Sequence, residues 1–171
     1  AKIGPGAEAL VDTASGARLS FRQLNERTNQ TANTLLAMHF TPGERIACLM
    51  SNQSQYLESY YACAKAGFVF VALNWRLTVP ELSFQLMDSG ATAVIYGSDQ
   101  AALVEPLREQ FAGVRWLCAD AGEYAGAVAE AATAEPPIGA TGEDPLYMMY
   151  TSGTTGRPKG ALMSHRANIA W

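Results

Sequence analysis

The chain has 171 residues, of which 49% are hydrophobic and 16% are charged, a balance that excludes intrinsic disorder and is ample for one domain with a buried core. The sequence has no apolar run long enough for a membrane span, and residues 1–15 lack the basic start and apolar stretch of a signal peptide. The net charge is −4, and residues 1–150, with nine basic and sixteen acidic residues, are negative, whereas the last 21 residues carry three basic residues and no acid.

The first predicted elements are a hairpin and a long helix. EALVD and ARLSF, separated by the turn-forming TASG, predict a β-hairpin. Ser20 and Gln23 then fit a capping box, in which the hydroxyl accepts a free helix amide and the Gln side chain reaches back to another. Apolar and small residues follow at helical spacing as far as Met38, and Pro42-Gly43 stops the helix.

Residues 44–118 alternate short apolar runs with helical segments. Strands are predicted over 45–50, 68–73, 92–96 and 114–118. The first of the helices between them is predicted over 54–66, with a cap near Asn52 or Ser54 and an end at Gly67. The second is predicted over 79–89, after a second capping box at Thr78-Val79-Pro80-Glu81, and the third over 100–111. Continuous apolar strands between helices are typical of a parallel sheet covered on both faces. The predicted fold class is therefore α/β, an open and mostly parallel sheet flanked by helices.

The pattern breaks after residue 118. Residues 119–145 are rich in Ala, Gly and Pro and predict a surface connection with a weak helix over 124–133. LYMMY at 146–150 predicts a strand that enters a new structural unit. We therefore expect an N-terminal α/β subdomain over 1–118, a connecting segment over 119–145, and the start of a second subdomain over 146–171.

Three cysteines and the charge balance limit the compartment and the partners. Cys48, Cys63 and Cys118 never form a CxxC pair and have apolar neighbours. This usage favours buried free thiols in a reducing compartment, which predicts the cytoplasm, over a disulfide framework or a zinc site. Because nucleic-acid modules are usually basic overall, no nucleic-acid partner is expected, and the small positive C-terminal part is better suited to a compact anion such as phosphate.

The decapeptide TSGTTGRPKG, immediately after the strand at 146–150, carries the clearest chemical signal. Its glycines allow positive φ and the close approach of backbone amides to a ligand, its four hydroxyls can donate hydrogen bonds, and Lys159 adds a mobile cation. Nine specified positions at roughly 6% usage each arise by chance on the order of 10⁻¹¹ times per start position. The segment predicts a polyphosphate site rather than an ordinary surface turn.

This turn differs from the common phosphate loop of nucleotide hydrolases. That loop needs Gly-Lys-[Ser/Thr] and a helix starting there, whereas here Pro158 precedes Lys159 and Gly160 follows it. ALM at 161–163 predicts another strand, with a helix only after Ser164 as its N-cap. We therefore expect a strand–turn–strand unit that holds phosphate with loop amides and hydroxyls rather than with a helix end.

YTSGTTGRPKG resembles the phosphate-loop signature of adenylate-forming (AMP-binding) enzymes. LSFRQLNERTNQTANTL and the long run from PGERIACLM to DSGATAVIYG likewise resemble the opening of such a ligase, and ALNWRLT with DSGATAVI most resembles the acyl-CoA synthetase and fatty-acid–CoA ligase branch. The resemblance implies the first part of the large N-terminal domain of an acyl-CoA synthetase-like fold.

The resemblance also implies a two-step reaction. A carboxylic acid, a fatty acid in our expectation, attacks the α-phosphorus of ATP to form acyl-AMP, and coenzyme A then takes the acyl group, with Mg²⁺ as a further cofactor. Position by position, the residues implied to bind the ATP phosphates are the hydroxyl and amide donors Thr151, Ser152, Thr154 and Thr155, the turn-permitting Gly153 and Gly156, and the cation Lys159. The resemblance places no catalytic and no metal-binding residue in this chain.

Other polar and aromatic residues have simpler interpretations. His165 is expected to help a helix start rather than to act in catalysis, and His39 to lie on the surface. Tyr56, Tyr60 and Tyr61 share a helix with apolar residues and are expected to pack rather than to stack on a ligand. Arg76 is expected to form a structural salt bridge rather than to meet a partner surface.

Relatives of this kind are several times longer, so the expected segments for adenine, ribose, the magnesium-binding glutamate and the acyl pocket are absent. We therefore expect an N-terminal fragment, inactive alone, whose apolar faces at Leu162, Ile169 and Trp171 are covered by the missing C-terminal part, another partner or a homo-oligomer. The alternative hypothesis is a short non-catalytic nucleotide- or protein-binding module. Reading the gene past codon 171 separates the two hypotheses, since an open frame favours the first and a stop favours the second.

Overall fold

A computed structural model describes residues 4–13, 15–137, 139–151 and 157–169, and for residue 169 the backbone only. The strands are β1 (Glu8–Val11), β2 (Arg18–Ser20), β3 (Arg45–Leu49), β4 (Val69–Ala72), β5 (Ala93–Tyr96), β6 (Arg115–Cys118), β7 (Pro145–Thr151) and β8 (Lys159–Ser164). The helices are α1 (Phe21–Ala37), α2 (Ser54–Ala66), α3 (Val79–Ser89), α4 (Ala101–Gln110), preceded by a 3-10 turn at Ser98–Gln100, α5 (Gly122–Glu130) and α6 (His165–Ile169).

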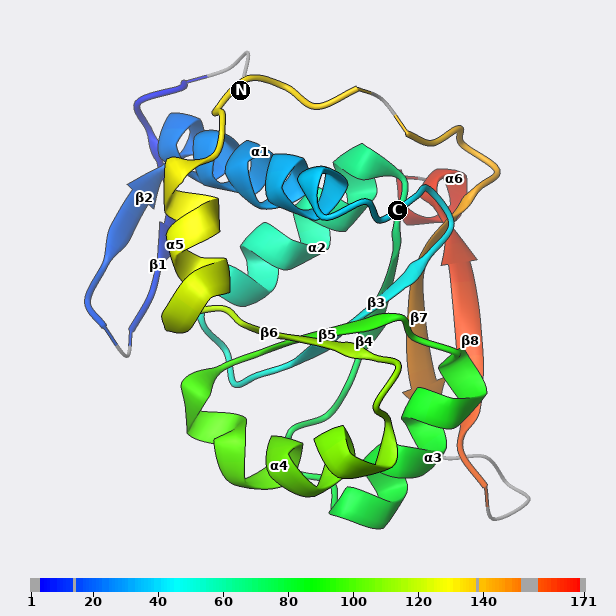
Figure 1. The fold of residues 1–171 in the computed structure, drawn as a ribbon. Coiled ribbons are helices and arrows are strands. Elements are labelled where there is room, and N and C mark those ends of the chain that lie inside the picture. The colour runs from blue at the N-terminus through cyan, green and yellow to red at the C-terminus, as the bar shows by residue number, and fades with distance from the viewer. Residues whose placement is uncertain (1–3, 14, 138, 152–156, 170–171) are drawn as a thin grey trace.

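The main sheet has six strands in the order β6-β5-β3-β4-β7-β8. All neighbours pair in parallel except β7 and β8, which are antiparallel. Helices α1, α2 and α5 lie on one face and α3 and α4 on the other (Figure 1). The predicted α/β class with an open, mostly parallel sheet flanked by helices is confirmed.

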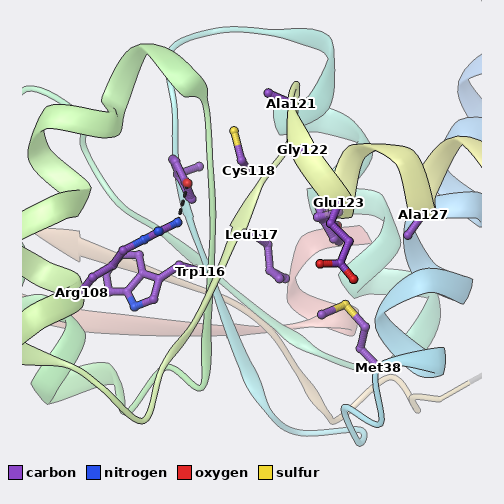
Figure 2. Close-up of a pocket in the computed structure, with 11 residues that line it drawn as sticks. Met38, Arg108, Trp116, Leu117, Cys118, Ala121, Gly122, Glu123 and Ala127 are labelled. Carbon is purple, nitrogen blue, oxygen red and sulfur yellow. Dashed lines mark hydrogen bonds between the residues drawn. The ribbon is translucent and has the colours of Figure 1, made fainter.

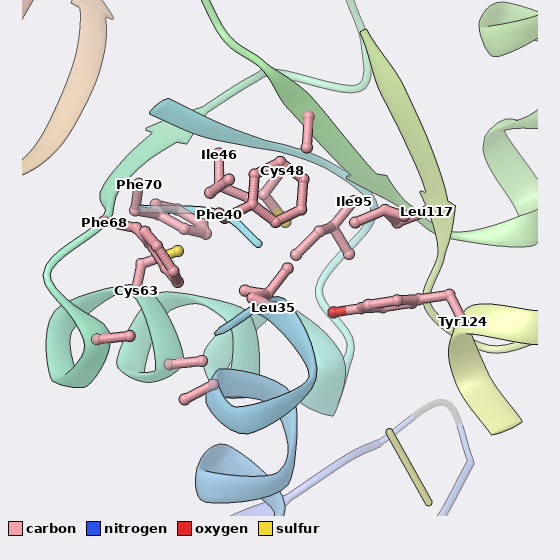
Figure 3. Packing of buried hydrophobic residues seen from close by; sticks show 14 of the residues in the cluster. Leu35, Phe40, Ile46, Cys48, Cys63, Phe68, Phe70, Ile95, Leu117 and Tyr124 are labelled. Atoms are coloured by element: carbon pink, nitrogen blue, oxygen red, sulfur yellow. The ribbon is translucent and has the colours of Figure 1, made fainter. Parts of the chain in front are cut away.

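The central strands alternate their side chains between two apolar clusters. On β3, Ile46 and Cys48 face α1 and α2, while Ala47 and Leu49 face α3 and α4, and all four are fully buried. Figure 3 shows the first cluster, where Phe68 and Phe70 pack with Leu35 of α1 and Cys63 of α2. Burial on both faces explains why these strands are continuous apolar runs in the sequence.

Local signals set most helix ends as predicted. The side chains of Ser20 and Gln23 form the expected capping box of α1, and Thr78 and Glu81 form that of α3. Gly67 ends α2 in the left-handed conformation with φ 79°, where a glycine is favoured. The predicted hairpin is also confirmed as the antiparallel pair β1–β2.

The predicted cap of α2 was wrong. The N-cap residue is Gln53, and its side chain makes no capping hydrogen bond. Instead, the backbone N–H of Ser54 donates to Asp12 Oδ2 at 3.3 Å. A carboxylate from the β1–β2 hairpin therefore takes the place of a local cap. A local sequence pattern cannot predict this contact.

The connecting segment is tied to α1 more closely than predicted. Helix α5 ends at Glu130 rather than at 133, and we name the following residues 131–135 the strap. Asn29 Nδ2 donates to the carbonyl of Thr133 at 2.8 Å, and Asn33 Nδ2 donates to the carbonyls of Ala132 and Ala134. Lys65 Nζ, on α2, donates at 2.6 Å to Glu135 Oε2, so the strap is fixed to two helices.

The strand predicted over 146–150 is β7, which pairs in parallel with β4 and so belongs to the same sheet as the earlier strands. The division of the chain into subdomains at residues 118 and 145 stays a prediction.

Candidate functional site

The β7–β8 hairpin carries the donor-rich turn. Thr151, the last residue of β7, is paired with Lys159, the first residue of β8, and Thr151 Oγ1 donates to the carbonyl of Lys159 at 3.5 Å. The turn therefore joins two antiparallel strands, as predicted from the sequence, and no helix begins at its lysine. This geometry differs from a phosphate loop that ends in a helix.

The turn lies at the carboxyl edge of the parallel strands. Because β7 runs parallel to β4, Thr151 at the end of β7 lies at the same edge of the sheet as the loop after β4. In open α/β sheets, ligands bind outside the carboxyl ends of the strands.

Two basic residues at the end of the turn are open to solvent. Arg157 and Lys159 are both exposed, and among the described residues neither has a carboxylate within ion-pair distance. No Asp or Glu follows Asp144 in the sequence. Two cations with no neutralising partner in the described parts of the chain therefore stand beside the turn, where an anion would be attracted.

Most of the predicted phosphate-binding residues lie outside the described part of the chain. They are Ser152, Gly153, Thr154, Thr155 and Gly156, and the roles expected of them stay predictions. The structure brings together only Thr151 and Lys159 of the predicted set, one at each end of the turn.

The other end of the hairpin is held by a short loop before β7. Thr141 donates from its backbone N–H and its hydroxyl to Asp144 Oδ2, at 2.6 and 2.8 Å, and these two bonds lower the pKa of the Asp144 carboxyl. The backbone N–H of His165 donates to the carbonyl of Asp144 at 3.1 Å. The hydroxyl of Ser164 accepts from the N–H of Ala167, which confirms Ser164 as the N-cap of α6.

His165 lies far from the turn. His165 follows the last residue of β8, whereas the turn precedes the first residue of β8. The length of the strand, about 17 Å, therefore separates them. Its half-buried ring has no hydrogen-bond partner for Nε2 in the described structure. Its position and its backbone bond to Asp144 agree with the expected structural role at a helix start.

Tyr56 and Tyr60 of α2 pack as predicted, whereas Tyr61 is 45% exposed and Arg76 differs from the prediction. Tyr56 and Tyr60 meet the ring of Phe70 edge-on, with centroids 5.3 and 5.4 Å apart. The exposed Arg76 forms no ion pair within the described structure. Its guanidinium instead lies 4.3 Å from the ring centroid of Trp75, so the predicted salt bridge was wrong and a cation–π contact replaces it.

The cysteines differ in burial. Cys48 and Cys63 are fully buried free thiols, as predicted, and burial raises the pKa of each thiol. Cys118 is half-buried instead, and its Sγ lies 3.3 Å from Asp120 Oδ1.

Within the described ranges, no group of His, Cys, Asp and Glu side chains forms a potential metal site. In the same ranges, none of the helices has the length and the apolar composition that a membrane span requires.

A pocket of about 410 Å³ lies at the opposite end of the sheet, around β6 (Figure 2). Arg108, at its wall, donates to the hydroxyl of Tyr96 at 2.6 Å, so its charge already has a polar partner. Strands β6 and β7 are separated by β5, β3 and β4, which places this pocket about 19 Å from the hairpin. It is therefore separate from the phosphate turn.

Comparison with known proteins decides the family. A family model described as AMP-binding enzyme matches residues 1–171. The chain belongs to the AMP-binding enzyme family. This family match agrees with the resemblance that the donor-rich turn of this AMP-binding chain showed in the sequence.

Relatives of this AMP-binding chain include two curated CoA ligases. It is 37% identical to a long-chain-fatty-acid–CoA ligase of Mycobacterium tuberculosis, over 98% of this chain and 34% of the relative. It is 42% identical to a feruloyl-CoA synthase of an Amycolatopsis species, over 100% of this chain and 33% of the relative. The chain therefore spans about a third of the length of the curated relatives it matches.

Solved structures agree on the fold of this AMP-binding chain. The N-terminal domain of FACL13 from Mycobacterium tuberculosis superposes with a TM-score of 0.85 at 39% identity, over 92% of this chain and 40% of that domain. ATP-bound MatB from Rhodopseudomonas palustris superposes with a TM-score of 0.82 at 30% identity, over 95% and 33% of the two chains. The expected fold, that of the N-terminal domain of acyl-CoA synthetases, is confirmed.

Sequence reasoning missed a contact that holds the hairpin. The hydroxyl of Tyr150 lies 2.8 Å from Asp88 Oδ2, although the two residues are 62 positions apart. The DSGATAVI run that contains Asp88 carried part of the family resemblance, but no local pattern links it to the turn.

Proposed function

We propose that the chain is the N-terminal part of an ATP-dependent acid–CoA ligase of the AMP-forming type. The parent enzyme would join a carboxylic acid, a fatty acid in our expectation, to AMP and then transfer the acyl group to coenzyme A. The fatty-acid–CoA and feruloyl-CoA ligases among the relatives support this class of reaction.

The observation that carries the proposal is the setting of the turn. It stands at the carboxyl edge of the sheet between Thr151 and Lys159, with two exposed cations beside it and no carboxylate after Asp144. This set of donors fits the phosphates of ATP. ATP supplies the leaving pyrophosphate and the activating AMP group.

In this proposal the turn acts on the β- and γ-phosphates. The donors are the hydroxyl and amide groups of Thr151, Ser152, Thr154 and Thr155, while Gly153 and Gly156 permit the bend. Lys159 offsets the negative charge that grows on the departing pyrophosphate as the α–β bond breaks, and such stabilisation of developing charge lowers the barrier. Each group would act by position and charge, with no proton transfer of its own.

The other cofactors and partners belong to the parent enzyme in this proposal. The described residues offer no cluster of metal ligands, so Mg²⁺ would be held by the phosphates and by residues of the remaining part. Coenzyme A and the carboxylic acid would likewise bind mainly there. We propose the cytoplasm as the compartment, supported by the two buried free thiols, and a homo-oligomer as one way of covering exposed apolar residues.

ATP–pyrophosphate exchange by the full-length protein tests the proposal. We expect labelled pyrophosphate to enter ATP only when a suitable acid is present, with a panel of fatty and aryl acids as candidates. Omission of the acid is the control for hydrolysis. Absence of exchange with every acid would rule out the ligase assignment.

A second measurement concerns residues 1–171 alone. Because this part offers contacts to the phosphates and none of the expected contacts to adenine or ribose, we expect ATP to bind with a Kd weaker than about 1 mM. We also expect no exchange activity. Calorimetry that finds micromolar binding would contradict the expectation and favour a self-sufficient nucleotide-binding module.

A further inference from the structure

The side chain of Tyr150, the residue just before Thr151, connects the hairpin to α3. Its hydroxyl lies 2.8 Å from Asp88 Oδ2 and 3.2 Å from the carbonyl oxygen of Gln85, both in the last turns of α3. A phenol has one proton to donate, and the charged carboxylate is the stronger acceptor. Tyr150 is half-buried and packs against the apolar cluster on the α3 face.

Gly160 makes room for this connection from the other arm. It is paired directly with Tyr150, and a Cβ built at Gly160 would lie 3.0 Å from Met148 Sδ and 3.4 Å from Tyr150 Cζ. A Cβ at residue 160 would therefore crowd the side chain of Met148 and would meet the ring of Tyr150 at ordinary van der Waals distance, so the ring lies close to the glycine backbone. Both strands of the hairpin thus contact the ring of Tyr150, at the position next to the turn.

Few other contacts hold this end of the hairpin. Within the described residues, β8 is an edge strand that pairs with β7 alone, and its residues from Lys159 to Leu162 are exposed. On the opposite face of β7, Met149 is also exposed. A turn that must place several donors around phosphate needs its supporting residues fixed to within about 0.5 Å, and the bond from Tyr150 to α3 provides such a fixed point.

We propose that Tyr150, Asp88 and Gly160 form a latch that positions the phosphate turn, with Tyr150 as a positioning residue for ATP. The proposal rests on the ligase function proposed for this turn. The latch touches no phosphate itself. It acts by holding the start of the turn against the end of α3, so that the donors beyond it need less ordering when ATP binds.

Kinetics of the full-length enzyme test the latch. We expect Tyr150→Phe to raise the KM for ATP in the exchange assay about tenfold, the effect of losing one charge-assisted hydrogen bond, with a smaller change in kcat. Asp88→Ala should match it, and the double variant should be no worse than either single variant. Asp88→Asn keeps an acceptor oxygen and should stay within about twofold of the wild type.

Tyr147→Phe is the matched control. It removes a phenol hydroxyl from the same strand on the opposite face, where Tyr147 packs against the α2 side, and should leave the KM for ATP unchanged. If Tyr150→Phe lowered the melting temperature but left this KM unchanged, Tyr150 would be merely structural and the proposal would be overturned.

Amide hydrogen exchange of the same full-length variants needs no activity. We expect Tyr150→Phe and Gly160→Ala to speed exchange over residues 157–160, and Tyr147→Phe to leave it unchanged. Unchanged exchange in both latch variants would overturn the latch. If the wild-type enzyme showed no pyrophosphate exchange with any acid, the proposed function would fail, while hydrogen exchange would still decide the latch.

Discussion

The central strands and the β7–β8 hairpin belong to one sheet, but they are held in different ways. In β3 and β5, Ile46 and Val94 are fully buried between helices on both faces, whereas Met149 of β7 and Leu162 of β8 are 45% and 53% exposed. Apolar burial therefore stabilises the centre, while paired backbones and a few polar contacts shape the hairpin. The comparison indicates that the core that stabilises the fold and the turn proposed to bind ATP lie in separate parts of the sheet, so we expect that each can be changed with little effect on the other.

Replacing a core aromatic should give the largest effect. Phe70 of β4 is 2% exposed and packs against Tyr56 and Tyr60. We expect Phe70→Ala to lower the free energy of unfolding by about 3–5 kcal/mol, because it removes apolar burial and leaves a cavity. Urea unfolding measures the change, and Met87→Ala, at a side chain 69% exposed, should cost less than about 0.5 kcal/mol.

Removing the lysine of the turn should change ATP binding instead of stability. We expect Lys159→Met in the full-length enzyme to raise the KM for ATP about 10- to 100-fold, the effect of one lost hydrogen bond to a charged group, with unfolding unchanged. Arg166→Met is a matched control, since it removes a cation that pairs with Glu143 near the far end of β8. A similar rise in both variants would point to general charge loss and contradict a local role.

The ion pair of the strap should make stability depend on pH. Hydrogen bonds from Lys65 and Asn25 lower the pKa of Glu135 from 4.5 to about 2. Because the folded pKa is depressed, this stabilisation is present above pH 4.5 and is lost as the pH falls towards 2. The Glu135 side chain is 64% exposed, so solvent screening limits the effect to about 1 kcal/mol.

Urea unfolding between pH 2 and 6 measures that effect. We expect the stability difference between the wild type and Glu135→Gln to shrink as the pH falls through this range, because the variant has no carboxylate to protonate. Asn25 and Lys65 remain in both proteins, which makes the amide variant a matched comparison. A constant difference would show that the ion pair contributes nothing to the strap.

The smallest effect on stability is expected on the exposed face of β8. Because Leu162 is 53% exposed, Leu162→Ser should change the free energy of unfolding by less than about 0.5 kcal/mol. If this face is covered by self-association, sedimentation of residues 1–171 should show weaker association for the variant. Equal association of both proteins would place the contact elsewhere.

The sequence predicted the regular parts of this fold well because their signals are local. Capping boxes at Ser20 and Thr78, the glycine after α2, and apolar strand runs each depend on neighbouring residues, and the structure confirmed them. The error at the start of α2 came from a contact between distant segments, because Asp12 lies 42 residues before Ser54. The error at Arg76 was local, because its guanidinium lies over the ring of its neighbour Trp75 instead of meeting a carboxylate. For the site, the sequence named the donors of the turn, and the structure placed Thr151 and Lys159 at its ends.

By itself, the sequence determined the α/β class and the family, and it predicted an anion-binding turn, because periodicity, composition and a nine-position signature each depend on consecutive residues. Only the tertiary structure decided that β7 adds to the first sheet beside β4, that α1 amides hold the strap, and that Tyr150 reaches Asp88. These features depend on which distant segments meet, and that choice is made by the burial of the whole sheet rather than by any local stretch of chain.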